Sequence, residues 1–492
     1  MGVGHGGGPY MTSAESRTDV VVAGGGLAGI SAAVDLAEAG LSVTLLEARP
    51  WLGGATCSFA RRGLIIDNGQ HAFLRCCGAY RELLAKLGVA SSVAIQKRLE
   101  LTVLGSPDGT AALRRSSLPA PLHLVRALAG YGPLPKADRL KAAAAMAALR
   151  IAGLGPEDDD LTFSEWLADR GQDENARRLL WDLLSTAALG LPADQADLSL
   201  AASTIRTAVF SGRRSADIGV PAVPLSKLHS APAAALLGRL GARVLLGVRA
   251  AAIQLSSRGG YDVWLDPSGP GGPDGVLSGG PSALHAAGLV LAVPAWEAAV
   301  LAPAELGREA ERWTRLEALP VLSLHVIYGS PVTRLPYAAV VDSPVRWVID
   351  KSGPAGLHTG QYLAASVPVA DSYVDLPASR LRAELLPELE RLFPAATDAE
   401  IQDFFITRER RALVRQVPGS QQLRASQPPG LRGLALAGAW TSTGWPDSME
   451  GAVRSGHSAA LKVLSELTSG NQIASAAAIE PAPPVTSMAR AI

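Results

Sequence analysis

The hydrophobic pattern is sharpest near the start of the chain. A run of β-branched apolar residues, Val20–Val22, is followed by a helical pattern that stops at Gly40, and a second apolar run, Val43–Leu46, ends at Glu47. Short apolar runs of this kind are typical of strands buried on both faces, and the stretch between them has the length and periodicity of one helix. The pattern therefore predicts a strand, a helix and a second strand.

A glycine motif lies in the turn between this first strand and the helix. Gly24, Gly26 and Gly29 form G-x-G-x-x-G, in which the first glycine permits a tight turn, the second lets a pyrophosphate approach the backbone and the third lets the helix pack closely on the strand. The helix N-terminus offers free N–H groups to phosphates, and Glu47 stands where a carboxylate can accept hydrogen bonds from a ribose. A dinucleotide site is predicted; the alternative is a glycine-rich turn in an ordinary α/β unit.

A second glycine pair indicates which dinucleotide this is. Gly53 and Gly54 follow Glu47 and Arg49 closely. They would bring the backbone back toward the same diphosphate, which suits a long, enclosed FAD better than an exchangeable NAD.

The far end of the chain supplies a matching segment. A short apolar strand, Leu434–Ala437, runs into Gly438, and a helical pattern opens at Met449 and continues to Leu464. The two ends together resemble the flavin amine oxidase and phytoene desaturase superfamily. There, such a segment lays a helix N-terminus under the flavin ring, where its dipole stabilises negative charge on the reduced flavin.

Further segments narrow the resemblance to the hydroxysqualene dehydroxylase family of bacterial hopanoid pathways. The likeness extends from about Asp19 to Leu464, and the segments that carry it are Asp67–His71, Asp217–Leu228, Pro344–Asp350, Ala412–Arg424 and Thr443–Gly456. The resemblance implies FAD as the cofactor and hydroxysqualene, a thirty-carbon allylic alcohol, as the substrate. In that family a reduced flavin delivers hydride to the substrate, which releases water and leaves squalene.

The resemblance also implies an α/β fold in which a Rossmann-like FAD-binding domain is interleaved with an α+β substrate domain. The FAD-binding domain is expected to comprise residues 19–100, 220–305 and 430–468, and the substrate domain residues 101–219 and 306–429. The terminal segments 1–18 and 469–492, rich in small and polar residues, are expected to be disordered.

A set of FAD contacts follows from the two motifs and the resemblance, with the backbone of Val248 beside the adenine. The expected contacts are Gly24, Gly26, Leu27, Ala28, Gly29, Glu47, Arg49, Gly53, Gly54, Val248, Gly438, Met449, Gly451 and Ala452. Three residues depart from the superfamily pattern: Trp51, Ala55 and Ala439. Each removes a polar contact to FAD, and a charged hydrogen bond of this kind is worth roughly 1.5–3 kcal/mol. These departures affect the expected affinity for FAD more than the expected identity of the cofactor.

Loss of a hydroxyl group requires a proton, and three residues are candidates to donate or orient it. His71, preceded by Gln70, is the first candidate to donate or orient the proton; the alternative is a loop histidine bonded to backbone. Asp350 is the second, because a carboxyl in an apolar pocket stays protonated more readily; the alternative is an aspartate that caps a turn. Asp217 is a third candidate, more typical of a structural role. Three tryptophans could face an allylic cation or belong to the core: Trp347, Trp440 and Trp445.

Composition restricts partners and location. Lys plus Arg and Asp plus Glu number 45 each, so no net field favours nucleic acid. The three cysteines cannot form a paired framework, and the first residues lack the order of a signal peptide, which favours a reducing cytoplasm. No His, Cys, Asp or Glu group has ligand spacing, so no metal is expected.

A thirty-carbon substrate would have to be taken from lipid. The helical segment Lys136–Leu154, with Lys136, Arg139, Lys141 and Arg150, is therefore expected at the inner face of a membrane as a peripheral contact; the alternative is a core helix with basic ends. Only one nucleotide motif is visible, so an external electron donor is expected. Three other functions stay open: a carotenoid desaturase that uses oxidised FAD, a flavin amine oxidase, and a non-catalytic lipid-binding relative.

Overall fold

The computed structural model describes residues 18–106, 109–155, 158–266, 283–428 and 430–468. The terminal segments expected to be disordered lie outside these residues, apart from Thr18. Thr18 is buried, and its hydroxyl oxygen lies 2.8 Å from that of Thr44.

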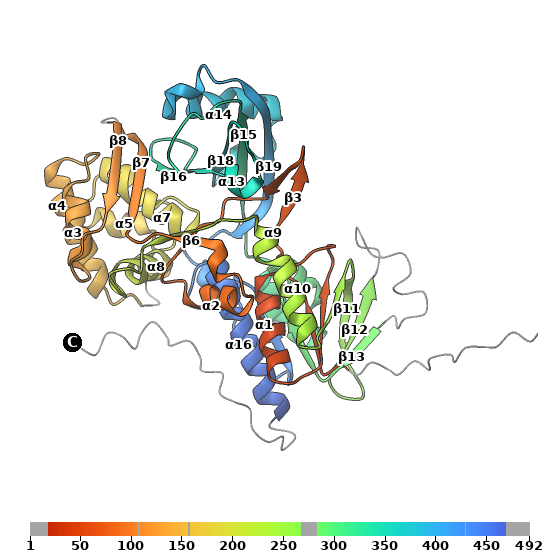
Figure 1. Ribbon diagram of the computed structural model, residues 1–492. Coiled ribbons are helices and arrows are strands. Elements are labelled where there is room, and N and C mark those ends of the chain that lie inside the picture. Colours follow the sequence, from red (N-terminus) through yellow and green to blue (C-terminus); the bar gives the residue numbers. More distant parts are fainter. Residues whose placement is uncertain (1–17, 107–108, 156–157, 267–282, 429, 469–492) are drawn as a thin grey trace, which may run out of the picture.

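A five-stranded parallel sheet forms the centre of the first domain (Figure 1). Its strands, in spatial order, are β10 (Arg243–Leu246), β2 (Val43–Glu47), β1 (Val20–Ala23), β14 (Gly288–Leu291) and β20 (Leu434–Leu436). The strand–helix–strand prediction is confirmed, since β1 and β2 pair in parallel and α1 (Leu27–Glu38) connects them. The strands come from all three segments predicted for the FAD-binding domain.

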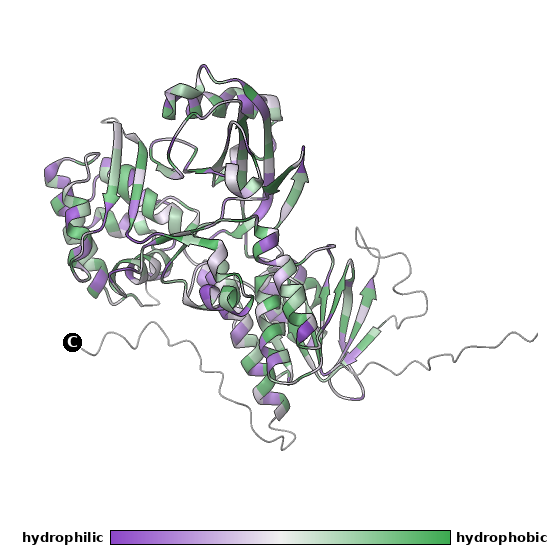
Figure 2. Ribbon diagram, viewed as in Figure 1, coloured by the Kyte–Doolittle hydropathy of each residue, from purple (hydrophilic) through white to green (hydrophobic). Residues whose placement is uncertain are grey.

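Alternate side chains of the sheet enter two different cores. Val20, Val22 and Leu45 face α1, α10 (Ser230–Arg239) and α16 (Met449–Thr468). The other face packs on a three-stranded antiparallel sheet and two helices: β11 (Arg249–Leu255), β12 (Tyr261–Asp266), β13 (Ala283–Ala286), α11 (Ala295–Leu301) and α12 (Gly307–Trp313). In Figure 2 the helices α10 and α16 carry both hydrophobic and hydrophilic residues, as amphipathic helices do, whereas α1 is buried from Leu27 to Ala37.

The first and last described helices of this domain pack closely against each other. A Cβ atom at Gly456 of α16 would lie 2.3 Å from the carbonyl oxygen of Ala28 and 2.7 Å from Cβ of Ser31. Glycine at this position therefore permits α16 to cross α1 at close range.

A seven-stranded mixed sheet forms the upper part of the second domain in Figure 1. Its strands, in spatial order, are β19 (Ile401–Val414), β15 (Ala318–Tyr328), β18 (Gln361–Val367), β17 (Trp347–Asp350), β16 (Tyr337–Val340), β7 (Glu100–Ser106) and β8 (Gly109–Arg114). The pairing of β16 with β7 is parallel and the other pairings are antiparallel. Leu381, Leu385 and Leu389 of α14 (Ala378–Leu392) cover one face.

Helices form the rest of the second domain, around a core that contains Phe163 and Trp181. They are α3 (Val125–Ala129), α4 (Lys136–Ile151), α5 (Phe163–Ala168), α6 (Glu174–Ala176), α7 (Asp182–Leu189) and α8 (Leu198–Phe210). Short elements connect the two domains: β3 (Ser58–Arg61), β4 (Leu64–Asp67), β5 (Phe73–Leu74), α2 (Gly78–Lys86), β6 (Val93–Ile95), β9 (Ile218–Pro221), α9 (Leu225–Leu228), α13 (Ser352–Ala355) and α15 (Ser420–Leu423).

Asp217 is a buried structural anion of this second domain. Nε of Arg115 donates to its Oδ1 at 2.6 Å, and the backbone N–H of Leu99 donates to the same oxygen at 2.9 Å. Within the described part of the chain, no helix is both long enough and apolar enough to span a bilayer. The same residues contain no cluster of three or more His, Cys, Asp or Glu side chains suited to a metal ion.

Candidate functional site

The glycine loop after β1 is held in a conformation that depends on its glycines. Gly24 has φ of +112°, a backbone region that favours glycine. A Cβ atom at Gly29 would lie 1.8 Å from the carbonyl oxygen of Gly24, so α1 can start this close to β1 only without a side chain there. At Gly26, by contrast, the nearest described atom to a Cβ would be Cα of Gly54, at 4.0 Å.

The second glycine pair returns to this loop, as the sequence predicts. The N–H of Gly53 donates to the carbonyl of Gly25 at 2.8 Å, and Gly26 and Gly53 form a parallel bridge. Nη1 of Arg49 donates to the carbonyl of Gly54 at 3.3 Å. The two backbones therefore form one cradle with open space above Gly26, where a diphosphate can approach the N-terminus of α1.

Glu47 lies at the end of β2, beside the cradle. Its Oε2 accepts from the N–H of Gly25 at 2.8 Å, and its Oε1 accepts from the N–H of Arg49 at 2.8 Å. Burial raises the pKa of this carboxyl group. The N–H of Val248 donates to the carbonyl of Glu47 at 3.0 Å, so the residue expected beside the adenine does lie next to the residue expected at the ribose.

The C-terminal segment reaches the same region through β20, the edge strand that pairs with β14. The N–H of Gly438 donates to Oγ of Ser455 at 2.8 Å, and a Cβ atom at Gly451 would lie 2.6 Å from the carbonyl of Pro446. Glu450 fastens the start of α16 to α2, because its carboxylate accepts from the N–H groups of Ala79 and Tyr80 at 3.1 and 2.8 Å. The glycine cradle, the carboxyl group of Glu47 and the N-terminus of α16 together fit a flavin dinucleotide.

A cavity of about 1200 Å³ leads from this region into the second domain. Its inner end is lined by Ala55, by Asn68–His71 and by the turn before α16, Trp445–Glu450. Farther out, the walls are mainly aliphatic side chains of α3, α4, α7 and α8 and of strands β15 and β19. The cavity therefore joins the predicted flavin segments to a long apolar chamber.

His71 and Gln70 both line the inner end of this cavity. Nδ1 of His71 lies 3.1 Å from the carbonyl of Gly69, which places the ring proton on Nδ1 and leaves Nε2 as an acceptor. Burial lowers the pKa of this histidine, so the neutral ring is favoured near pH 7. Neither amide atom of Gln70 has a hydrogen-bond partner among the described residues, which leaves a buried amide available to a ligand.

Asp350 does not lie at this site, and its candidacy as proton donor is corrected. Its Oδ1 accepts from the N–H and the hydroxyl of Ser352 at 2.9 and 2.6 Å, and its Oδ2 accepts from Nε2 of Gln361 at 2.7 Å. It lies outside the cavity lining and caps a turn, which is the alternative that the sequence left open. Its neighbour Lys351 forms an ion pair with buried Asp67, with Nζ 2.7 Å from Oδ2.

Besides Glu450, two carboxyl groups of the cavity wall were not identified from the sequence. Glu409, on β19, lies near the loop of Asn68, whose Nδ2 is 3.4 Å from its Oε1. Asp447 accepts from the N–H of Val414 at 2.7 Å, and burial raises its pKa. The run of charged residues in β19 was the available signal for Glu409; Asp447 belongs to the Thr443–Gly456 segment but was not singled out.

Some of the tryptophan and cysteine side chains line the cavity, and others belong to the core. Trp347 and Trp445 line the cavity, whereas Nε1 of Trp440 donates to the carbonyl of Val293 at 2.9 Å in the core. Cys76 and Cys77 also line the cavity. A hydrogen bond from the Cys77 thiol to the neighbouring Cys76, together with burial, raises the pKa of Cys77 well above its ordinary value, which favours an unreactive thiol.

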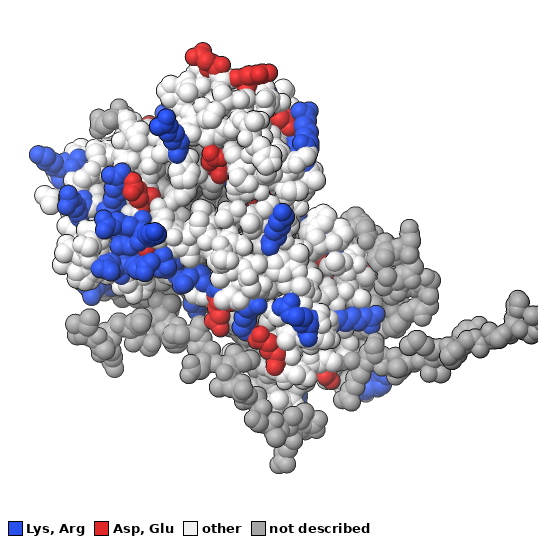
Figure 3. Space-filling view, viewed as in Figure 1, with Lys and Arg blue, Asp and Glu red and all other residues white. Residues whose placement is uncertain are grey.

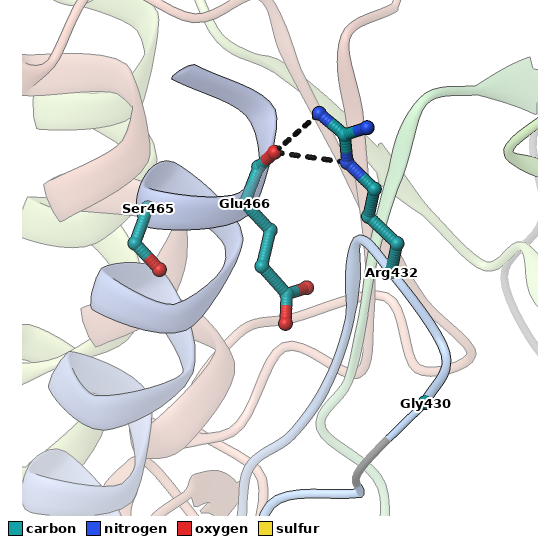
Figure 4. A pocket seen from close by; sticks show the side chains of 4 residues that line it. All are labelled: Gly430, Arg432, Ser465 and Glu466. Carbon is teal, nitrogen blue, oxygen red and sulfur yellow. Dashed lines mark hydrogen bonds between the residues drawn. The ribbon is translucent and has the colours of Figure 1, made fainter. Parts of the chain in front are cut away.

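A second, open hollow lies beside the end of α16 (Figure 4). Nε and Nη2 of Arg432 donate to the backbone carbonyl of Glu466 at 3.0 and 2.8 Å. The side chain of Glu466 accepts from the N–H of Gly433 at 2.6 Å. Because these groups form hydrogen bonds with each other, the hollow marks a structural contact between α16 and the loop before β20.

Comparison with known proteins agrees with this geometry. The sequence profile of the family "Flavin containing amine oxidoreductase" matches residues 27–464. The chain belongs to this family. As a flavin-containing amine oxidoreductase family member, it is an FAD-dependent oxidoreductase, and its α/β fold combines a parallel Rossmann-like sheet with a mixed sheet.

Individual relatives extend the comparison. A hydroxysqualene dehydroxylase from Rhodopseudomonas palustris is 30% identical, and the match covers 90% of this chain and 98% of the relative. A zeta-carotene desaturase from Zea mays is 26% identical, with coverage of 89% and 82%. The solved structure of wild-type putrescine oxidase bound to putrescine has a TM-score of 0.68, is 19% identical and covers 91% of this chain and 99% of its own. This structural likeness shows the fold.

Proposed function

We propose that this protein is a hydroxysqualene dehydroxylase, which replaces the hydroxyl group of hydroxysqualene by hydrogen to give squalene. The observation that carries the proposal is the long aliphatic cavity that ends at the predicted flavin segments. The similarity to the hydroxysqualene dehydroxylase of Rhodopseudomonas palustris over 90% of the chain supports the same reaction.

The reaction must break a carbon–oxygen bond and form a carbon–hydrogen bond. One hydride and one proton are consumed for each molecule of squalene and each molecule of water formed. When bound in its reduced form, FAD supplies the hydride, and an external donor restores the reduced form. The protein has to hold the apolar chain, keep water away from the allylic carbon and deliver the proton to the leaving oxygen.

The FAD-holding residues are the cradle glycines, Glu47 and Arg49 on one side and the start of α16 on the other. The open space at Gly26 receives the diphosphate, and Val248 lies beside Glu47 at the adenosine end. Met449, Gly451 and Ala452 begin α16, whose N-terminal dipole favours an anion near the ring.

We assign the role of proton donor to the carboxyl group of Asp447. Among the described residues, the carboxyl groups that line the cavity are those of Glu409, Asp447 and Glu450, and Glu450 is already bound by α2 and Arg454. Burial raises the pKa of Asp447, so its acid form persists closer to neutral pH than that of an exposed aspartate. His71 has the complementary role: its Nε2 accepts from the substrate hydroxyl and orients it, with the free amide of Gln70 beside it.

Anaerobic single-turnover experiments with chemically reduced enzyme and hydroxysqualene test this assignment. We expect Asp447→Asn to slow flavin reoxidation by roughly 10²–10⁴-fold, the contribution of a general acid, while FAD stays bound. Asp350→Asn is the matched control, because Asp350 lies outside the cavity, and its rate should equal that of the unmodified enzyme. If Glu409→Gln rather than Asp447→Asn gives the slow reaction, Glu409 is the donor.

The second candidate function is a carotenoid desaturase, favoured by the similarity to the zeta-carotene desaturase of Zea mays. The same cavity would hold a carotenoid precursor, but oxidised FAD would then remove hydride from the substrate. If oxidised enzyme introduces double bonds into zeta-carotene, and reduced enzyme leaves hydroxysqualene unchanged, the desaturase replaces the dehydroxylase.

A further inference from the structure

Exposed apolar side chains are concentrated on one side of the second domain. Of the eleven large hydrophobic residues that are exposed in the described part of the chain, five lie between residues 118 and 151. Leu122 and Val125 are 51% and 55% exposed, and Leu140 and Ile151 of α4 are 75% and 83% exposed. These four residues, with Lys136 and Arg150, are named here the α3–α4 face.

α4 has two apolar sides, and only one of them belongs to the core. Ala142, Ala145 and Leu149 are buried in the core of the second domain. A different stripe of the helix, at the spacing of successive turns, lines the mouth of the cavity and is exposed: Lys136, Leu140, Ala143, Ala147, Arg150 and Ile151. A helix that faced only core and water would carry polar residues along this second stripe.

The same side of the molecule is strongly basic. Between residues 118 and 151, the range that holds these exposed apolar side chains, the chain has five Lys and Arg residues but one acidic residue, although the whole chain is balanced. Figure 3 shows Lys and Arg side chains gathered on the side where α3 and α4 lie. Lys136 and Arg150 stand at the two ends of the exposed apolar stripe.

We propose that the α3–α4 face docks on the surface of an anionic lipid bilayer, so that the cavity opens into the lipid. Apolar side chains on a helix with a basic border bind at the boundary between headgroups and acyl chains, where each Lys or Arg gains about 1 kcal/mol near an anionic surface. A second copy of this chain would bring two basic faces together, which is repulsive. This inference goes beyond the proposed reaction, since the face would serve any apolar substrate of the cavity.

Flotation of the FAD-loaded protein with vesicles tests the proposal. One set of vesicles is phosphatidylcholine alone, and the other contains about 30% phosphatidylglycerol, whose negative charge attracts basic segments. We expect the protein to float with the anionic vesicles and much less with the neutral ones. Failure to float with the anionic vesicles, or equal flotation with both, would overturn the proposal.

Two double variants separate the apolar and the electrostatic contributions. Leu140→Glu/Ile151→Glu and Lys136→Glu/Arg150→Glu should each reduce the bound fraction by about tenfold or more. The matched controls are Val300→Glu/Leu255→Glu and Arg308→Glu/Arg334→Glu, which change exposed residues elsewhere and should float normally. FAD content and melting temperature confirm that every variant is folded.

Arg139 is kept unchanged in these variants, because its guanidinium group donates to the carbonyls of Leu134 and Ala129 and supports the local fold. Sedimentation velocity tests the alternative occupant of the α3–α4 face, a second copy of this chain. If the protein is a dimer that Leu140→Glu/Ile151→Glu dissociates, while flotation is unaffected, the face is an interface between copies and the lipid proposal fails.

Discussion

At the scale of single residues, the glycines of the cradle differ in what they tolerate. A Cβ atom at Gly26 would meet only Cα of Gly54 at 4.0 Å, whereas at Gly29 it would lie 1.8 Å from the carbonyl of Gly24. We therefore expect Gly26→Ala to keep the stability of the FAD-free protein but to weaken FAD binding by about tenfold or more, because the methyl group occupies the space of the diphosphate. Gly29→Ala should destabilise the fold itself by about 1–3 kcal/mol.

Flavin absorbance per protein and urea unfolding of the FAD-free protein measure these two effects. Gly238→Ala is the control, since a Cβ atom there, in α10, meets open space. Equal loss of FAD by all three variants would contradict the assignment of Gly26 to the diphosphate.

Two buried histidines predict how stability depends on pH. Burial lowers the pKa of both His229 and His325 to about 3. In the unfolded chain a histidine titrates near its ordinary pKa of about 6.5, so between these values the unfolded state binds more protons and stability falls as pH falls. Each histidine should then remove about 1.4 kcal/mol per pH unit from the free energy of unfolding between roughly pH 6 and pH 4.

Urea unfolding at a series of pH values checks this dependence. His325→Gln should lower the slope by about the contribution of one histidine. It also loses the ring that stacks on Phe405 and bonds to Tyr362 and Thr407, so absolute stability falls as well. His358→Gln, the same change at an exposed histidine, is the matched control for the substitution itself.

At the scale of elements, the anion of Asp217 connects β9 to the loops around β7 and β8. Asp217→Asn would leave the buried guanidinium group of Arg115 without a counter-charge, which should cost about 3–5 kcal/mol of stability. FAD binding should survive, because Asp217 lies outside the cradle. Denaturation monitored by circular dichroism measures the loss, and Asp375→Asn, in an exposed pair with Arg410, should change stability by less than about 1 kcal/mol.

Elements whose pattern is local were predictable from the sequence. The strand, glycine turn and helix from Val20 to Glu38 appear as expected, because apolar runs, spacing and glycines determine them within a few residues. The cavity carboxyls were not predictable in this way. The pKa of Asp447 depends on burial, with contributions from Val414 and Arg424, and Asp350 is turned away from the site by Ser352 and Gln361. Such partners are brought together only by the tertiary fold.

At the scale of the whole molecule, FAD connects segments from both ends of the chain and should stabilise them together. A ligand that binds only the folded state adds about 2.7 kcal/mol at a concentration 100 times its dissociation constant. Removal of FAD should therefore lower the melting temperature, and added FAD should raise it in a concentration-dependent way. Differential scanning calorimetry checks this, with NAD⁺ as the matched control; an equal shift with NAD⁺ would contradict selectivity for FAD.

The contact between α1 and α16 joins two segments that leave the ribosome far apart in time. Figure 1 shows α1, near the start of the chain, beside α16, near the end of the described residues. β20 and α16 come from residues 434–468, so the growing chain carries β1 and α1 through most of synthesis without the strand and helix that complete their layer. The apolar surface of α1 around Ala28 and Ala32 stays uncovered for that period. Translation thus creates a long interval in which the nascent nucleotide-binding fold exposes apolar surface of the kind that promotes aggregation.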